Sequence, residues 1–364
     1  MQMMIMEGLV VTLALLAVGY FWRWRRFAHE RAVFGTAIDR HWTNWWAGLI
    51  GGGLAGLVVS GIAALGHLAL PGPVGLWLGA LTLLGLLGSG LGYAPAVLGF
   101  SGIAAVGTAG LAPWLALPAV DRWAWQWLAL LALLGAANAG LLRFLAPPID
   151  VPAIHAGKRG AQIASYTRRQ FYWVPVVLPL IGASTSTWAL VPLVLGAALT
   201  TRKQLPTAAI HAWARHEAWS AGLTAILAAG TWWQPRLALA ALWGQAGLSL
   251  ALLIWHHHAA AAGHSFVSQT DLGVRLVAIQ PDTPASKMGL QAGDIVLQCN
   301  QVPVRTEAAL YAALQAHPTY CRLRVQRLDG AIKLTETAIF KGAPHELGMI
   351  TFTEDEHEED LSRR

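Results

Sequence analysis

The stretch Asp282–Val296, with the sequence DTPASKMGLQAGDIV, decides the fold of the C-terminal part of this chain. It begins with turn-forming residues, and its Gly293 and Asp294 lead into the run Ile295–Cys299. That run is rich in β-branched and apolar side chains, as is the run Gly273–Ile279 upstream of it, and both are typical of short strands. Short strands separated by turns predict a small α+β domain.

The same stretch resembles the pattern of bacterial PDZ domains: a Leu-Gly-hydrophobic opening, a Thr/Ser-Pro-Ala turn, a Gly-Leu pair and a Gly-Asp-hydrophobic strand. Leu272, Gly273 and Val274 supply the opening, while Asn300 and Gln301 stand where the pattern has Asn-Gly. Gln tolerates a positive φ less well than Gly, so the type of that turn stays open. Because PDZ domains bind a peptide as an added strand, the resemblance implies a protein-binding module over residues 271–353.

The peptide groove is predicted between one strand and one helix. The loop that opens the strand presents backbone N–H groups that can hold a carboxylate, and its glycine permits unusual dihedral angles. Thr306 is a good N-cap for a helix over Glu307–Ala316, which carries two leucines four residues apart on one face. These leucines either line the groove or fill the core, and both roles stay open. The predicted peptide-binding residues are Leu272, Gly273, Val274, Arg275, Leu276, Leu310 and Leu314.

The rest of the C-terminal region contains a hairpin, two cysteines and an acidic tail. Arg322–Arg327 and Ala331–Ile339 are the arms of the predicted hairpin. Cys299 and Cys321 are the only cysteines, and without a CxxC spacing we expect buried free thiols rather than a disulfide or a metal site. Residues 354–364 are strongly acidic and predict a solvated, disordered tail, with contact to the basic cytoplasmic loops as the alternative.

The composition of the rest of the chain indicates a membrane protein. Of the 364 residues, 55% are hydrophobic and 12% are charged, whereas soluble domains carry about 25% charged residues. Residues 1–264 hold 15 Lys and Arg against 6 Asp and Glu, and residues 265–364 hold 10 against 13. The positive excess flanks the apolar segments, so it indicates membrane orientation and not nucleic-acid binding.

Residues 1–258 are predicted to form an α-helical polytopic membrane domain, joined by a linker at 259–270 to the small α+β PDZ domain. A spanning helix needs about 20 mostly apolar residues. The first such window is a retained signal anchor, because arginines follow it at once and no Ala-x-Ala cleavage site is present. Seven windows qualify: Ile5–Trp22, Trp45–Leu70, Pro73–Tyr93, Ala94–Leu117, Trp123–Ala146, Ala218–Trp233 and Arg236–Trp255.

One further apolar segment, Trp173–Thr200, is interrupted by three prolines and is either a kinked span or a re-entrant hairpin. The chain has three basic segments, Arg23–Arg40, Lys158–Arg169 and Arg202–Arg215. The positive-inside rule places all three in the cytoplasm only if the segment returns to the side it left. The N-terminus is then outside and the PDZ domain is cytoplasmic; a full span would move the PDZ domain outside.

Glycines recur through the second and third predicted spans. Small residues let membrane helices approach closely, so the pattern predicts tight helix packing. The glycines are Gly51, Gly52, Gly53, Gly56, Gly61, Gly85, Gly88, Gly90 and Gly92.

Two motifs resemble those of intramembrane proteases, and each lacks a second residue that the chemistry requires. In His216-Glu-Ala-Trp-Ser220 the second zinc ligand of His-Glu-x-x-His is replaced by serine. Ser101 lies in a Gly-x-Ser-Gly sequence, but no histidine lies inside a later span to activate it. We therefore expect no enzyme activity, metal or cofactor, with an intramembrane protease or a PDZ-bearing protease regulator as the alternative.

Taken whole, the chain resembles the MinJ-type membrane proteins of Firmicutes cell division. The resemblance rests on Gly157-Lys-Arg-Gly160, Trp173-Val-Pro175, Met288–Ile295 and His345-Glu-Leu-Gly-Met349. It implies an adaptor or scaffold in the membrane of a Gram-positive cell, at the septum and poles. Its implied partners are a DivIVA-like marker and a MinD-like division inhibitor, and no catalytic residues carry over.

Overall fold

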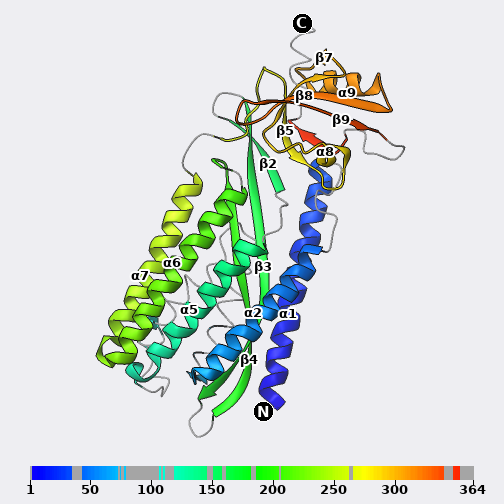
Figure 1. Ribbon diagram of the computed structural model, residues 1–364. Helices are drawn as coiled ribbons and strands as arrows, with labels where there is room; N and C mark the ends of the chain where they lie inside the picture. The colour runs from blue at the N-terminus through cyan, green and yellow to red at the C-terminus, as the bar shows by residue number, and fades with distance from the viewer. Residues whose placement is uncertain are drawn as a thin grey trace.

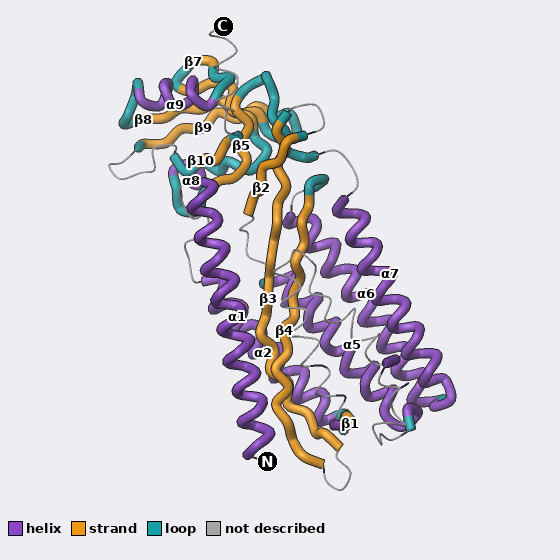
Figure 2. Tube along the Cα trace, turned by 180° about the vertical axis from the view of Figure 1, so that it is seen from behind, coloured by secondary structure: helices purple, strands orange, loops and turns teal. Residues whose placement is uncertain are grey.

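The computed structural model describes residues 2–34, 43–72, 74, 78, 106–107, 110, 119–145, 151–157, 161–181, 186–204, 206–261, 265–339 and 347–352. Figure 1 and Figure 2 show helices packed around a long β-hairpin, with a small mixed domain at one end. The first helix begins at the opposite end of the molecule from that domain.

Five long helices make up the described part of the bundle. They are α1 (Gln2–Phe34), α2 (Thr43–Leu65), α5 (Val120–Phe144), α6 (Pro206–Trp233) and α7 (Ala238–Ala261), the last preceded by the 3-10 turn η1 (Pro235–Leu237). Each overlaps one predicted span. Within the described residues, three stretches are long and apolar enough to cross a membrane: Trp45–Leu65, Val120–Phe144 and Pro235–His256. The predicted spans Pro73–Tyr93 and Ala94–Leu117 lie almost entirely outside the described residues.

A long antiparallel β-hairpin runs through the bundle where Trp173–Thr200 was predicted to kink or to turn back. Its strands are β3 (Gln162–Ile181) and β4 (Ser186–Thr201), which pair along their length. The segment therefore returns to the end at which it starts, as the charge pattern predicts, and a single kinked span is wrong. At about 3.3 Å per residue, the 20 residues of β3 extend roughly 66 Å, about twice the ~30 Å hydrocarbon core of a bilayer.

Two short strands extend this sheet at opposite ends of β3. Strand β2 (Val151–Ala156) pairs antiparallel with Gln162–Thr167, so most of the basic segment Lys158–Arg169 lies in or beside a strand. Strand β1 (Leu70–Pro71) pairs parallel with Leu180 and Ile181 at the other end. Between these pairings, one edge of β3 pairs with no strand among the described residues.

One face of the hairpin belongs to the main apolar core. Side chains alternate along β3, and the even-numbered ones from Tyr172 to Leu180 are buried in the same cluster as Trp123, Trp127 and Leu134 of α5. The Tyr172 hydroxyl donates to the carbonyl oxygen of Leu141 at 3.1 Å. The strand therefore packs as one layer against the helices.

Helix α2 covers the edge of β3 that has no strand partner. Gly48, Gly52 and Gly56 follow one another at four-residue steps on α2, and a side chain at any of them would collide with a backbone carbonyl oxygen of β3, those of Phe171, Trp173 and Pro175 in turn. Four helical residues advance about 6.0 Å and two strand residues about 6.6 Å, so the two rows stay in register over three contacts. Gly52 and Gly56, which were predicted from the sequence to pack between helices, therefore pack a helix against a strand edge instead, together with Gly48.

Prolines and one serine complete the closure of this edge. In an antiparallel strand, alternate residues direct their N–H and C=O groups to the same side, here the odd-numbered residues toward α2. Pro175 and Pro179 occupy such positions and have no N–H to leave unpaired. Val177 lies between them, and its N–H donates to Oγ of Ser60 at 2.9 Å. An unpaired N–H in hydrocarbon costs several kcal/mol, which is the physical reason for this arrangement.

At Gly196, the outer edge of β4 is hydrogen-bonded to a buried side chain of α5. The amide oxygen of Asn138 accepts a hydrogen bond from the N–H of Gly196 at 2.8 Å, and its Nδ2 donates to the Gly196 carbonyl oxygen at 3.5 Å. Gly196 has φ 132°, and a side chain there would collide with the carbonyl oxygen of Gln170. Only glycine can adopt this φ and also leave room for the carbonyl oxygen of Gln170. Helix α1 packs nearby, with Val18 against Val194.

The C-terminal domain is a six-stranded sheet with two short helices. Its elements are β5 (Val274–Ile279), α8 (Pro284–Lys287), β6 (Ile295–Cys299), β7 (Val302–Pro303), α9 (Glu307–Gln315), β8 (Tyr320–Gln326), β9 (Ile332–Ala338) and β10 (Met349–Thr351). The strands lie in the order β10-β5-β6-β8-β9, and β7 pairs with β6. The predicted small α+β domain is confirmed, as are its helix and its β8–β9 hairpin.

Local hydrogen bonds explain where these elements start and turn. Oγ1 of Thr306 accepts a hydrogen bond from the N–H of Ala309 at 3.1 Å, which confirms the predicted N-cap. Asn300 and Gln301 have φ 48° and 70°, so the β6–β7 turn is left-handed at both positions despite the absence of glycine. Oδ1 of Asn300 holds the turn by accepting the N–H of Arg322 at 2.9 Å.

The C-terminal domain packs against the end of the hairpin at which β3 begins. Residues 265–270, predicted as part of a linker, lie beside β3: the N–H of Ala164 donates to the carbonyl oxygen of Val267 at 2.9 Å. The Tyr166 hydroxyl donates to the carbonyl oxygen of Val277 in β5 at 2.7 Å. One apolar cluster joins the hairpin, this segment and the domain, formed by Ala164, Tyr166, Val267, Val277, Ala278, Ile350 and Phe352.

Candidate functional site

The strand predicted to accept a peptide, β5, lies inside the sheet. Val274 and Arg275 pair with β6 on one side. From Leu276 to Ile279 the other side pairs with β10. At Leu276, β10 occupies the edge that was predicted to be open, and peptide binding along Leu272–Arg275 stays a prediction.

The surroundings of the residues that were predicted to bind a peptide show how each of them is packed. Gly273 is buried, and a side chain there would collide with the carbonyl oxygen of Val296. Leu276 is fully buried in the core, whereas Leu272 is exposed. Burial lowers the pKa of the Arg275 guanidinium below its ordinary value. Gly273 and Leu276 are therefore held inside the domain, whereas Leu272 lies exposed just before β5.

Strand β10 is the edge strand, and its outer side pairs with no described strand. Its side chains alternate between two apolar clusters. Met349 belongs to the core of the domain, whereas Ile350 belongs to the cluster that contacts the hairpin. Both faces of β10 are thus packed against apolar clusters. The backbone N–H and C=O groups on its outer side can pair with an added strand.

The turn before β10 has a geometry that suits a carboxylate. Leu347 and Gly348 have φ 56° and 84°, and their carbonyl oxygens accept hydrogen bonds from the N–H groups of Ala285 (3.1 Å) and Gln280 (2.8 Å). No described residue accepts a hydrogen bond from the N–H of Leu347 or Gly348. Successive N–H groups in such a turn form an anion-binding concavity. A side chain on Gly348 would collide with Thr283, so glycine is required for the turn.

Helix α9 approaches β10 through the core of the domain. Leu310 and Leu314 are 4% and 5% exposed, and they share one cluster with Leu347 and Met349. The two leucines therefore fill the core and connect the helix to the edge strand. Tyr311, next to Leu310, is exposed at 38%.

A second Leu-Gly-hydrophobic triplet, Leu347–Met349, is the sequence signal that locates this edge. The first triplet, Leu272–Val274, leads into β5. Both triplets fit the pattern of a strand opening, and chain order does not say which strand lies at the sheet edge. Only the pairing of β10 with β5 distinguishes them.

The other polar and reactive groups of the domain are structural. The carboxylate of Asp294 is buried and accepts the N–H of Gln291 at 3.0 Å, and burial raises the pKa of Asp294. Cys299 and Cys321 are free and buried, as predicted. A hydrogen bond to Cys299, together with burial, raises the pKa of Cys321, so this thiol stays protonated and unreactive.

The histidine motif of α6 lies at the α6–α7 contact. The ring of His216 is 5.1 Å from that of His256, which stacks on Trp213 at 4.1 Å between centroids. The indole N–H of Trp213 donates to Glu217 at 3.3 Å. Within the described ranges, no group of three or more His, Cys, Asp or Glu is placed to hold a metal ion. Ser101 of the Gly-x-Ser-Gly sequence lies outside the described residues.

Comparison with known proteins identifies the C-terminal domain and then the whole chain. The family model for the PDZ domain matches residues 275–327. The "Probable cell division topological determinant MinJ" of Lacticaseibacillus paracasei is 38% identical over 333 residues, which cover 85% of each chain. The chain belongs to the MinJ family. The "Cell division topological determinant MinJ" of Bacillus subtilis (strain 168) is 29% identical over 192 residues, 52% of this chain and 47% of that protein.

A shorter similarity is to a protease. The "Periplasmic serine endoprotease DegP" of Salmonella typhimurium is 36% identical over 64 residues, 18% of this chain and 14% of the protease. Relatives that match most of the chain are thus MinJ-family division determinants and not enzymes, and the protease match has only the length of a PDZ segment. The resemblance to MinJ-type proteins is confirmed, and a role in cell division follows from it.

Proposed function

We propose that the chain is a multi-pass membrane adaptor that positions division regulators at the septum and poles of a Gram-positive cell. By resemblance, it bridges a DivIVA-like marker and a MinD-like inhibitor. The PDZ domain binds a peptide or C-terminus of one of these partners along β10, and the apolar helices hold the complex at the bilayer.

The unpaired outer edge of β10 is the observation that carries this proposal. An extended peptide gains main-chain hydrogen bonds on such an edge, and side-chain contacts beside it set specificity. Tyr311 on α9 is exposed for such contacts, and the Leu347–Gly348 turn supplies N–H groups for a terminal carboxylate. An adaptor of this kind requires no catalytic group, so Ser101→Ala and His216→Ala leave localisation unchanged.

The proposed cytoplasmic position of the PDZ domain is supported by the distribution of basic residues. The basic end of α1, the start of β3 and the start of α6 all lie toward the PDZ end of the molecule (Figure 1). Burial and the nearby charge of Arg26 lower the pKa of Arg169, which indicates that two of the basic segments meet there. The positive-inside rule assigns such an end to the cytoplasm.

Site-specific crosslinking in cells tests the peptide edge. A photo-crosslinking amino acid at Tyr311 captures a division protein, whereas the same group at Leu334, which is exposed on β9 at the far side of the sheet, does not. Mass spectrometry of the crosslinked band identifies the partner, and a fluorescent fusion of each variant checks that it still reaches the septum. Equal capture from both positions would show that the β10 edge does not recruit the partner.

Reporter fusions test the orientation. Alkaline phosphatase fused after Arg364 stays inactive, because it folds only outside the cytoplasm, whereas a fluorescent protein at the same position is bright. Phosphatase activity there would place the PDZ domain outside and contradict the bridging role.

A further inference from the structure

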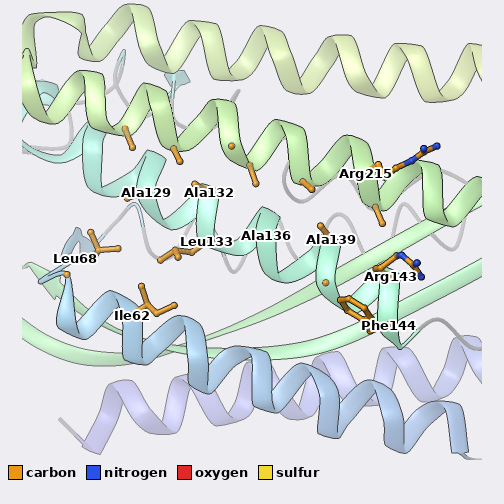
Figure 3. A pocket seen from close by; sticks show the side chains of 18 of the residues that line it. Ile62, Leu68, Ala129, Ala132, Leu133, Ala136, Ala139, Arg143, Phe144 and Arg215 are labelled. Carbon is orange, nitrogen blue, oxygen red and sulfur yellow. The ribbon is translucent and has the colours of Figure 1, made fainter.

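An open apolar groove lies between helices α2, α5 and α6 (Figure 3). Its volume is about 910 Å³, which is within the range of ligand sites in proteins. Small residues on facing sides of two helices make it, among them Ala129, Ala136 and Gly140 of α5 and Ala218, Gly222 and Ala225 of α6. A methyl group added at Gly140 or Gly222 would meet no atom within 4 Å, so the groove has free space beside both helices.

One end of the groove is cationic and the other is wholly apolar. Arg143 of α5 and Arg215 of α6 lie at the same end, and Ile62 and Leu68 lie at the opposite end (Figure 3). Both arginines are exposed, and neither forms an ion pair with another described residue. Two guanidinium groups at one end of the groove favour an anionic headgroup there, because a phosphate accepts charge-assisted hydrogen bonds from arginine.

The groove has the length of a lipid tail. From Ala129 to Arg143, α5 advances about 21 Å, since each helical residue contributes about 1.5 Å. One leaflet of a bilayer has a hydrocarbon depth of about 15 Å, half of the ~30 Å core. An acyl chain that starts at the arginines therefore stays within the groove over its whole length. The cationic end lies toward the PDZ domain, with Arg143 in the last turn of α5 and Arg215 in the third turn of α6.

We propose that this groove binds one anionic phospholipid, with its phosphate on Arg143 and Arg215 and an acyl chain along the Ala and Gly faces of α5 and α6. Basic pockets between membrane helices recognise anionic headgroups in this way. The Arg143 guanidinium also lies over the Phe144 ring, 5.8 Å from its centroid, which holds it at the mouth of the groove.

Native mass spectrometry of the full-length chain measures this binding. The protein is purified in detergent, stripped of lipid and mixed with equal amounts of palmitoyl-oleoyl phosphatidylglycerol and phosphatidylcholine. Wild-type protein retains phosphatidylglycerol in preference to phosphatidylcholine. The double variant Arg143→Gln/Arg215→Gln loses about thirtyfold in phosphatidylglycerol affinity, from about fivefold for each arginine near an anionic lipid. Arg236→Gln, a change of the same charge in η1 outside the groove, has no such effect.

A variant that fills the groove distinguishes binding of a lipid with its acyl chain from binding of a simple anion. Gly222→Leu places a side chain in the free space, so it lowers retention of both lipids. Gly230→Leu is the matched control, because Gly230 lies on the same helix, also has no atom within 4 Å of an added methyl group and does not line the groove. Size-exclusion elution and circular dichroism check folding of each variant, and Gly140→Leu replaces Gly222→Leu if the latter misfolds.

Four results would overturn the proposal. Wild-type protein would retain the two lipids equally, or the double arginine variant would behave like Arg236→Gln. If the arginine variant lost binding while both filled-groove variants kept it, the arginines would hold a surface anion and no acyl chain. A photo-crosslinker at Gly222 that labelled residues 79–118 instead of lipid would show that another part of the chain occupies the groove.

Discussion

Within the part of the chain that the structure describes, β3 of the helical bundle and β10 of the PDZ domain each have an edge without a strand partner, and the two edges differ in how they are covered. The edge of β3 is closed by glycines of α2, by two prolines and by Ser60. The outer edge of β10 has no such cover among the described residues. Backbone groups in hydrocarbon must be satisfied by protein, whereas those at an aqueous surface bind water until a partner replaces it. The closed edge is therefore structural, and the open edge is suited to binding.

The largest effect is expected where the closed edge is forced apart. Gly52→Leu drives a side chain into the carbonyl group of Trp173 and separates α2 from β3, which costs on the order of 3 kcal/mol or more. Gly53→Leu, on the next residue of the same helix, meets no atom within 4 Å and leaves stability nearly unchanged. Thermal unfolding of the purified full chain measures both. Similar melting temperatures for the two variants would contradict the proposed fit of helix to strand.

The turn that leads into the open edge is the next most sensitive position. Gly348→Ala combines a left-handed φ with a collision against Thr283, so we expect the PDZ domain to lose about 3 kcal/mol. Gly330→Ala has the same φ of 84° but free space, and it should cost only about 1 kcal/mol. Hydrogen exchange of the PDZ strands compares the two variants. An equal loss of protection in both would mean that strain, and not packing against Thr283, limits the turn.

The far side of the hairpin depends on the Asn138 amide. Asn138→Leu removes both hydrogen bonds to Gly196 and leaves its N–H and C=O groups buried without that partner. Hydrogen bonds in membrane proteins average about 0.6 kcal/mol and reach about 1.7, so we expect a loss of roughly 1–2 kcal/mol. Thermal unfolding in the same detergent measures it. A melting temperature equal to that of wild type would show that closure of this edge does not stabilise the hairpin.

The smallest effect concerns the contact between the two sheets. Tyr166→Phe removes the hydrogen bond to the carbonyl oxygen of Val277 and keeps the ring in its apolar cluster, so the cost is about 1 kcal/mol. We expect faster exchange in β5 and β10 with no change in the helices. Tyr311→Phe, which alters an exposed hydroxyl on α9, is the control. Unchanged exchange in Tyr166→Phe would indicate that the apolar cluster alone holds the domain.

Local sequence predicted β5, β6, α9, β8 and β9 of the PDZ domain with bounds close to the observed ones, but not the short elements α8, β7 and β10. Thr306 caps α9, and the β8–β9 hairpin forms at the predicted place. These features depend on neighbouring residues, so the chain specifies them without knowledge of the fold. The edge strand of the sheet could not be predicted in the same way, because Leu272–Val274 and Leu347–Met349 have the same pattern. Their difference lies only in which strand has a neighbour on both sides.

In the membrane part, too, some features could be predicted from local sequence and others depend on the tertiary structure. The apolar windows around α1, α2, α5, α6 and α7 were predicted from composition, and the return of Trp173–Thr200 was predicted from charge. Its β structure was not, since prolines in an apolar run fit a broken helix as well as a strand. The spacing of the prolines is explained only by the packing of β3 against α2, where alternate residues of the strand face the glycines.

The sequence by itself therefore determined the PDZ fold, the apolar helices, the direction in which the chain turns back and the family to which it belongs. These follow from local patterns of turn residues, hydropathy and charge, which act over a few residues or along a single segment. Only the tertiary structure decided that β10 and not β5 is the edge strand of the PDZ sheet, and that glycines of α2 close a strand edge. Both outcomes depend on pairing between segments more than 60 residues apart in the chain, and the free energy of such pairing is not encoded in any one of them.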